Sequence, residues 1–371
     1  MHQNVLAPGS QNWHQFPISA GVPAFFSEAR NAAVFDAAGH ELIDLYCGSG
    51  AIILGHAHPA QVAAVRAALS SGATVSLRHP VELELAEHLV GRVPGATHAA
   101  FFKTGSEAVH AAVTTALKAT GRRGILTTAY HGWLMPLGEL RALGGCTITQ
   151  LDWSSPTLAA DAAAQAGTAA CLVVSPTPDT PGPEAIQAVV AAARAGGAAV
   201  IFDEVKAGFR YAYPTVSAEV GVEPDITIVS KAIGNGFPIA AILGADLLAS
   251  TETFSVYSTY ASEIVSETAA LSCLTALEEG CYEEFAKQSS ALYREMGTIG
   301  ARYGVGVRGI PTFFRLELPE RLNPDELCRR LYQRDVLYHP LDQVLISAAH
   351  TPGVIDRICV GFDAALAEMA G

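Results

Sequence analysis

The sequence predicts an α/β protein with a mainly parallel sheet covered by helices on both faces. Between residues 99 and 244, short apolar runs rich in β-branched residues alternate with helical segments, a pattern typical of parallel strands buried on both faces. The chain of 371 residues, half of them hydrophobic, is long enough for a large core. We therefore expect a large domain with a sheet of the seven-stranded type and a smaller α+β domain.

The expected sheet is built from seven apolar runs, each of which has strand length. In chain order they are Ala99–Gly105, Gly124–Thr128, Cys146–Leu151, Ala169–Pro176, Ala198–Val205, Asp225–Lys231 and Ala240–Gly244. Helices are expected over Ser106–Thr120, where Gly121 is a plausible C-cap, and over about Pro183–Ala195. The alanine-rich stretch Leu158–Ala170 is helix-prone.

After about residue 280 the pattern changes to that of a compact α+β domain. The expected elements are a long helix (Cys281–Tyr303), a strand-like run (Phe313–Leu318), a helix (Pro324–Arg334) and a last helix from about Pro352. Near the N-terminus, VFDAAGHELIDL predicts a hairpin that turns at Ala38-Gly39 and packs onto this domain. The expected bounds are 1–45 for the N-terminal segment, 46–280 for the large domain and 281–371 for the small domain.

Charge and cysteine usage exclude several classes of protein. The formal net charge is −13 and there is no basic run, which argues against binding to nucleic acid or to an anionic membrane. The seven cysteines are scattered, without a CxxC pair, so neither a disulfide framework nor a metal cluster is expected. No signal-peptide pattern and no apolar run of membrane-spanning length is found. A cytoplasmic enzyme is the resulting expectation.

Candidate site residues follow the expected strands, because ligands of such sheets bind at the carboxyl ends of the strands. They are Gly105, Ser106, Tyr130, His131, Asp203 and Lys231. Taken singly each has a plain structural explanation, since a lysine after a strand is usually a solvated surface residue. Together they lie where one ligand would meet all of them.

This set of residues matches the chemical needs of pyridoxal 5'-phosphate (PLP). The dianionic phosphate suits the helix N-terminus at Gly105-Ser106. The carboxylate of Asp203 would keep the pyridine nitrogen protonated, and Lys231 would supply the amine for a Schiff base. Tyr130 and Val205 are candidates for the aromatic and the small apolar contact on the two faces of the ring.

Six motifs in order resemble those of the class III aminotransferases of PLP fold type I, closest to their glutamate-1-semialdehyde aminomutase-like members. They are LYCGSGAIILGHAHPAQV (Leu45–Val62), TGSEA (Thr104–Ala108), AYHGW (Ala129–Trp133), IFDEVKAGFR (Ile201–Arg210), PDITIVSKAIGNGFPIAAILG (Pro224–Gly244) and LISAAHTPGVIDR (Leu345–Arg357). The separation of 28 residues between Asp203 and Lys231 agrees with the same family.

The resemblance implies a role for each matching residue. Lys231 forms the Schiff base and shuttles a proton, Asp203 pairs with the pyridine nitrogen, Gly105 and Ser106 bind the phosphate, Tyr130 stacks on the ring, and His131 orders the adjoining loop. Thr259, with Ser258 as the fallback, would reach the phosphate of a neighbouring subunit, which implies a homodimer with active sites at the subunit interface. His56 and His58 are interpreted as residues of a structural loop rather than as a pair of metal ligands. Arg210 is either a structural or dimer-contact residue or a substrate clamp.

The departures from the family pattern concern the substrate side. The chain is shortened between Tyr130 and Asp203, the usual Glu-Pro reads Ser175-Pro176, and the usual Asn-Pro reads Glu263-Ile264. Where aminomutase-like members carry an N-terminal arginine for the substrate carboxylate, this chain has His14, and histidine lacks the bidentate fork and the permanent charge. Either Arg78 takes over, or the amino acceptor has no α-carboxylate, as in an amino sugar, an aminocyclitol or another biosynthetic ketone.

The function expected from these residues is transfer of an amino group between a small-molecule amino donor and a ketone or aldehyde acceptor, in two half-reactions on PLP. A 1,2-aminomutase would use the same residues and retain the intermediate. A decarboxylase or racemase on the same fold is a further alternative.

Overall fold

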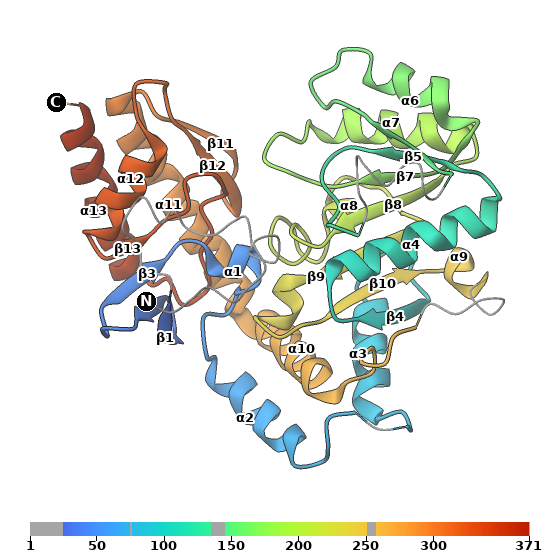
Figure 1. The fold of residues 1–371 in the computed structure, drawn as a ribbon, viewed down its shortest axis with the longest axis horizontal. Coiled ribbons are helices and arrows are strands. Elements are labelled where there is room, and N and C mark those ends of the chain that lie inside the picture. Colours follow the sequence, from blue (N-terminus) through green and yellow to red (C-terminus); the bar gives the residue numbers. More distant parts are fainter. Residues whose placement is uncertain (1–24, 75, 135–144, 251–256, 371) are drawn as a thin grey trace, which may run out of the picture. The chain divides into compact units, whose positions relative to one another are not determined.

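The computed structural model describes residues 25–74, 76–134, 145–250 and 257–370 (Figure 1). The chain divides into two compact units. One consists of Met1–His58 together with Cys281–Gly371, and the other is Pro59–Gly280. The first division thus falls after His58, whereas the sequence pattern predicts it after residue 45.

The unit Pro59–Gly280 is built on a seven-stranded sheet with the strand order β4-β10-β9-β8-β7-β5-β6. In that order the strands are His98–Phe102, Ala240–Gly244, Ile226–Ser230, Ala199–Glu204, Ala169–Val174, Gly124–Thr127 and Thr147–Gln150. Strand β10 is antiparallel to both of its neighbours, and all other neighbouring pairs are parallel. Six strands therefore run in one direction, and their carboxyl ends share one edge. The predicted fold class is confirmed.

The sheet is buried on both faces because alternate side chains of its central strands enter two different apolar clusters. In β7, Leu172 and Val174 belong to one cluster, and Cys171 and Val173 to the other. The first cluster also contains residues of α6 and α7, and the second contains the apolar side of α4 (Figure 1). This two-sided burial explains why the strands read as continuous apolar runs rather than as alternating ones.

The helical segments of this unit include those that surround the sheet. They are α2 (Pro59–Leu69), α3 (Pro80–Val90), α4 (Gly105–Thr120), α6 (Leu158–Ala166), α7 (Pro183–Ala195), α8 (Val216–Glu219), η3 (Lys231–Gly234), α9 (Asp246–Ala249) and α10 (Ile264–Ala276). Helix α4 ends at Gly121, whose φ of 67° gives the expected left-handed C-cap. Helix α10 packs against α2 and α3. A π-helical turn, η5 (Leu277–Cys281), leads into the next unit.

The other unit joins the N-terminal strands to the C-terminal part of the chain. Its four-stranded sheet has the order β1-β2-β3-β13, with bounds Phe26–Arg30, Ala33–Asp36, Glu41–Asp44 and Val336–Leu337. The predicted hairpin is present, since β2 and β3 pair antiparallel, and β3 pairs parallel with β13. A second hairpin pairs β11 (Gly306–Ile310) with β12 (Phe313–Glu317). The helices are α1 (Cys47–Gly50), α11 (Tyr282–Tyr303), α12 (Pro324–Tyr332) and α13 (Pro352–Ala370).

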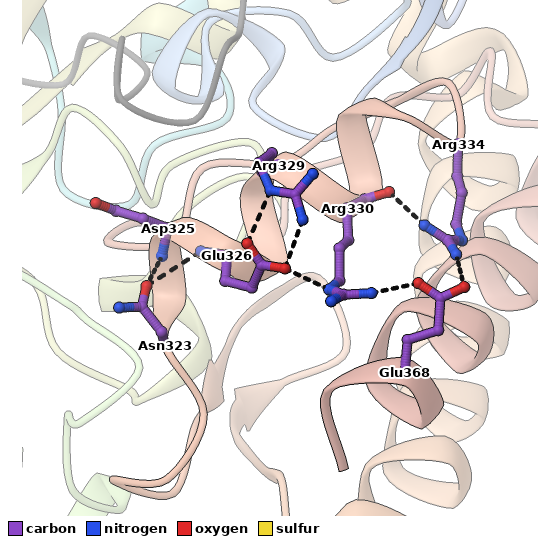
Figure 2. A network of polar contacts seen from close by, with 7 residues as sticks. All are labelled: Asn323, Asp325, Glu326, Arg329, Arg330, Arg334 and Glu368. Carbon is purple, nitrogen blue, oxygen red and sulfur yellow. Dashed lines mark hydrogen bonds and ion pairs between the residues drawn. The ribbon is translucent and has the colours of Figure 1, made fainter. Parts of the chain in front are cut away.

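A polar network fixes α12 to α13 (Figure 2). Asn323 caps α12, because its Oδ1 accepts hydrogen bonds from the backbone N–H groups of Asp325 (2.8 Å) and Glu326 (3.1 Å). Glu326 pairs with Arg329 and Arg330, and Glu368 of α13 pairs with Arg330 and Arg334. Arg330, in the last turn of α12, thus meets both a carboxylate of its own helix and one of the last helix.

Within the part of the chain that is described, no helix is both long and apolar enough to span a membrane.

Candidate active site

The predicted site residues lie at one edge of the seven-stranded sheet. Gly105 and Ser106 follow β4, His131 follows β5, and Lys231 comes directly after β9. Asp203 is the last residue but one of β8. Since β4, β5, β8 and β9 run in the same direction, these residues are delivered to the same edge, where ligands of parallel sheets bind.

A buried carboxylate–imidazole pair lies at this edge. Asp203 is only 5% exposed, and its Oδ2 lies 2.7 Å from Nδ1 of the buried His131. Its Oδ1 accepts the backbone N–H of Val205 at 3.2 Å. Because an ionised carboxylate only accepts hydrogen bonds, Nδ1 of His131 carries the proton of this contact. A buried carboxylate at this place can stabilise a nearby cation, as a protonated pyridine nitrogen requires.

The other ring nitrogen of His131 is left without a partner. Among the described residues, Nε2 of His131 is buried and makes no hydrogen bond. A buried polar atom of this kind is unfavourable unless something pairs with it. The residues at this edge therefore leave polar groups for a ligand to engage.

The first turn of α4 presents backbone donors that have no partner inside the helix, at the expected place. The side chain of Thr104, the N-cap, accepts the N–H of Glu107 at 3.2 Å, and Oε2 of Glu107 accepts the N–H of Thr104 at 2.9 Å. This capping box occupies the amides of the N-cap and of the third helical position. The N–H groups of Gly105 and Ser106, at the first and second positions, have no partner within the helix. Together with the helix dipole they form a site for an anion such as phosphate.

Two glycines let the elements of this edge approach closely. A Cβ atom on Gly105 would lie 2.6 Å from Cγ1 of Val205, so the turn before α4 packs directly on the end of β8. A Cβ atom on Gly132 would lie 2.3 Å from Oγ of Ser106, and its φ is +85°. Gly132 is therefore required both by space and by conformation. Through these contacts the turns after β4, β5 and β8 form one cluster.

Lys231 adopts a backbone conformation that is uncommon for a lysine. Its φ is 46°, in the left-handed region, which is disfavoured for residues with a Cβ atom. Such conformations persist where the surrounding structure imposes them, and they concentrate at functional sites. The preceding residue, Ser230, is fixed by a hydrogen bond from its Oγ to the carbonyl oxygen of Ile239 (2.7 Å). The lysine thus begins η3 in a constrained position.

The remaining predicted residues differ in their exposure, and one of them lies outside the described chain. The ring of Tyr130 is 56% exposed. Ser258 lines a cavity of about 270 Å³ together with Glu107 and other residues of α4, and Thr259 follows it in an exposed turn. The Nε of Arg78 lies 4.0 Å from Oε2 of Glu82, a contact that does not join it to the cluster. His14 lies outside the described residues.

Two residues with open alternatives occupy structural positions. Nε2 of His56 is 2.8 Å from Oδ2 of the buried Asp44, so this histidine ties its loop to β3. Arg210 is fully buried, which favours a structural role over a substrate clamp.

Some residues of the site could have been found by sequence reasoning and others could not. The pattern Thr104-x-x-Glu107 is a capping-box signal, and it marks the start of α4 directly. The contact of Gly132 with Ser106 has no signal in the sequence, because it depends on how two loops from different strands meet. The same holds for the ion pair between Lys103 and Glu263.

The chain matches the sequence model of one family, "Aminotransferase class-III", over residues 17–137 and 176–356. Among curated proteins, 2'-deamino-2'-hydroxyneamine transaminase of Streptomyces kanamyceticus is 31% identical over 94% of this chain and 91% of its own length. Glutamate-1-semialdehyde 2,1-aminomutase of Citrifermentans bemidjiense is 33% identical over 60% of this chain and 58% of its own length. Among solved structures, the PLP internal aldimine form of the Sphingopyxis sp. MTA144 FumI protein has a TM-score of 0.88 and 25% identity, covering 98% of this chain and 93% of that one.

The chain therefore belongs to the class III aminotransferase family, and PLP is its cofactor. The geometry at the sheet edge fits that cofactor, since it offers a buried carboxylate, an imidazole nitrogen without a hydrogen-bond partner among the described residues, and the N-terminus of α4. The interruption of the family match between residues 137 and 176 falls within the stretch that the sequence analysis found to be shortened.

Proposed function

We propose that this class III aminotransferase transfers an amino group to an oxo group of an amino sugar or aminocyclitol. The observation that carries this proposal is the similarity to a transaminase of 2'-deamino-2'-hydroxyneamine, an amino-sugar compound, over nearly the whole length of both chains. The sequence supports it from the substrate side. No arginine occurs in SQNWHQF around His14, so a dedicated clamp for an α-carboxylate on the acceptor is not expected there.

The residues of the sheet edge have distinct roles in this proposal. PLP supplies an aldehyde carbon that amines attack and a ring that withdraws electrons from the adjoining bonds. Lys231 would hold the cofactor through its Nζ, and the same atom would hold and move a proton. Asp203 keeps the ring nitrogen charged, and His131 orients Asp203 through the contact of 2.7 Å. The amides of Gly105 and Ser106 bind the phosphate.

The ring contacts and the subunit arrangement belong to the same proposal. Tyr130 and Val205 would contact the two faces of the ring. Thr259, with Ser258 as the fallback, serves the phosphate site of a second copy, so we propose a homodimer.

The two compact units correspond to a large and a small domain. The seven cysteines, all free thiols, suit the reducing conditions of the cytoplasm, where we expect the enzyme to act.

A second candidate function is a 1,2-aminomutase. It is favoured by the similarity to glutamate-1-semialdehyde 2,1-aminomutases, which are 33% and 34% identical to this chain. That similarity covers only 60% and 62% of the chain, against 94% for the transaminase. We therefore rank the aminotransferase first.

The two functions are separated by incubating the purified enzyme with a panel of amino donors. We expect the cofactor absorbance to change to that of the pyridoxamine form with release of a keto acid, followed by amination of a 2-oxo or 3-oxo amino sugar. If no donor releases a free carbonyl and glutamate-1-semialdehyde is isomerised, the aminotransferase proposal is wrong. Release of carbon dioxide would indicate the decarboxylase instead.

The role of Lys231 is tested by Lys231→Ala, with Lys287→Ala as a control at an exposed lysine of the other unit. We expect only Lys231→Ala to lose the absorbance that borohydride bleaches, together with turnover. A Lys231→Ala enzyme that still turns over substrate would remove this lysine from the mechanism.

Arg78→Ala should raise KM for an amino-acid donor if Arg78 binds the carboxylate of that donor. An unchanged KM would exclude Arg78 from the substrate site.

A further inference from the structure

An ion pair joins the end of β4 to the start of α10. Lys103 is the residue before the N-cap of α4, and its Nζ lies 3.3 Å from Oε2 and 3.4 Å from the carbonyl oxygen of Glu263. The two side chains are only 15% and 16% exposed. Removing charges from water to this extent is unfavourable unless they are paired. The contact is therefore a specific one rather than a passing surface pair.

Glu263 serves a second purpose, as the N-cap of α10. Its Oε1 accepts the N–H of Val265 at 2.8 Å, and its Oε2 accepts the N–H of Ser266 at 3.1 Å and the hydroxyl of Ser266 at 2.7 Å. Asn, Asp, Ser and Thr are the preferred N-caps, so capping alone does not require a glutamate. Asparagine would cap this helix without the charge that pairs with Lys103. Glu263 thus both caps α10 and forms the ion pair with Lys103.

The pair anchors the short segment that carries Ser258 and Thr259. Two turns lead from this segment to Glu263. In the first, the N–H of Ala261 donates to the carbonyl oxygen of Ser258 (3.0 Å), and in the second, the N–H of Glu263 donates to the carbonyl oxygen of Tyr260 (3.2 Å). Ser262 adds a hydrogen bond from its Oγ to Oε1 of Glu82 (3.1 Å). The position of the segment therefore depends on where Glu263 is held.

On the other side, Lys103 is fixed by the turn that precedes α4. Its backbone N–H donates to Oε2 of Glu107 at 3.2 Å, and the same oxygen receives the N–H of Thr104. The backbone of Lys103 is thus tied into the capping box that leaves the amides of Gly105 and Ser106 for an anion. The ion pair connects the two places to which phosphate binding has been proposed.

A neighbouring carboxyl group does not compete for Lys103. Glu267, one helical turn after Glu263, is fully buried, and neither of its carboxyl oxygens has a hydrogen-bond partner among the described residues. Burial, together with the nearby Glu82, raises the pKa of Glu267 to about 8. Near neutral pH this group is therefore mostly protonated, and Glu263 is the carboxylate that contacts the lysine.

We infer that Lys103 and Glu263 are positioning residues that hold the Ser258–Thr259 segment and the phosphate-binding turn of α4 in register. The inference rests on the proposed roles of Gly105, Ser106 and Thr259. It predicts that the ion pair is needed for tight binding of the cofactor phosphate, although neither side chain touches the reacting atoms.

The test measures PLP binding to the apoenzyme for Glu263→Asn, Lys103→Met and the double variant. Glu263→Asn keeps a capping oxygen for α10 and loses the charge, so it separates the ion pair from the cap. We expect each single variant to bind PLP about tenfold more weakly, the effect of losing one charge-assisted contact. The double variant should bind as weakly as either single one, because both remove the same interaction.

Controls separate positioning from general stability. Lys103→Arg, which keeps the charge, should retain PLP binding within about twofold, and Lys287→Met, which breaks an exposed ion pair in the other unit, should leave binding unchanged. In Glu263→Asn the melting temperature of the apoenzyme should change little, whereas the dissociation constant for PLP should rise about tenfold. Single variants that bind PLP as tightly as the parent, or effects that simply add in the double variant, would overturn the inference. If the parent enzyme is active in the donor assay and the variants bind PLP as tightly as the parent, the inference is wrong and the proposed function still stands.

Discussion

At the scale of single residues, the glycine before α4 allows a close contact that no larger residue would permit. A Cβ atom at position 105 would lie only 2.6 Å from the Cγ1 atom of Val205. Gly105 lies at the first position of α4, so any displacement of its backbone moves the amides that are proposed to bind phosphate. The packing of this one residue is thus directly connected with the anion site.

We expect Gly105→Ala to weaken PLP binding by about tenfold or more, because overpacking typically costs about 1–3 kcal/mol. Because Val205 is itself proposed to contact the ring, Val205→Ala alone is the reference: the double variant Gly105→Ala/Val205→Ala should bind PLP about as tightly as Val205→Ala, since the methyl groups that would overlap are then absent. Gly297→Ala in α11 is the matched control, because a Cβ there meets open space. Titration of the apoenzymes with PLP checks all four. Equal affinity of Gly105→Ala and the parent enzyme would show that the turn can shift without consequence.

Part of the candidate site could be predicted from the sequence and part could not. Asp203 and Lys231 were found because each follows an apolar run, and the edge at which parallel strands end is a general feature of such sheets. The contact between His131 and Asp203 could not be found in this way, because it joins the ends of β5 and β8, which are separated in the sheet by β7. Their distance depends on the path of two loops rather than on any local pattern.

At the scale of secondary-structure elements, the start of α4 combines a stabilising cap with the proposed anion site. Thr104→Ala removes the hydroxyl that accepts the N–H of Glu107. We expect this change to lower the free energy of unfolding by about 1 kcal/mol and to weaken PLP binding, since the first turn of the helix would fray. Asn323→Ala removes a cap of the same kind from α12 in the other unit.

Comparison of these two variants separates stability from function. Both should shift the midpoint of chemical denaturation of the apoenzyme, whereas only Thr104→Ala should raise the dissociation constant for PLP. If Asn323→Ala weakened PLP binding equally, the effect would be one of general stability, and the cap of α4 would have no special connection with the phosphate.

The elements themselves were predicted where the local sequence decides the structure. The buried strands β5, β7, β9 and β10 appear as largely apolar runs. Helix α7 has the predicted bounds Pro183–Ala195 because it begins at a proline and ends before Gly196. The helices α2, α3 and α10 were not predicted. Helix α10 is apolar around most of its surface, with buried residues on several sides, so it lacks the amphipathic period that marks a surface helix.

At the scale of the whole molecule, buried titratable groups make stability depend on pH in two opposite directions. Burial lowers the pKa of His350 to about 4. The unfolded chain therefore binds a proton that the folded chain does not, from the ordinary histidine range near pH 6.5 down to about pH 4, and stability falls as the pH falls through this window. Burial raises the pKa of Glu204 to about 7 and that of Glu267 to about 8. These two groups destabilise the folded chain as the pH rises above the ordinary carboxyl range.

The contribution of Glu267 can be isolated by difference. Between about pH 4.5 and pH 8 the unfolded state ionises this group while the folded state keeps it protonated, so stability is lost as the pH rises through that range. Glu82, Glu263 and Lys103 face the same carboxyl group and remain in place in Glu267→Gln. The free energy of unfolding of this variant, minus that of the parent, should increase with pH by at most about 1.4 kcal/mol per pH unit. The exposed Glu283→Gln should give a flat difference in urea denaturation of the apoenzymes from pH 5 to about pH 8. A flat difference for Glu267→Gln as well would mean that Glu267 ionises in the folded protein at its ordinary pKa, and that it does compete with Glu263 for Lys103.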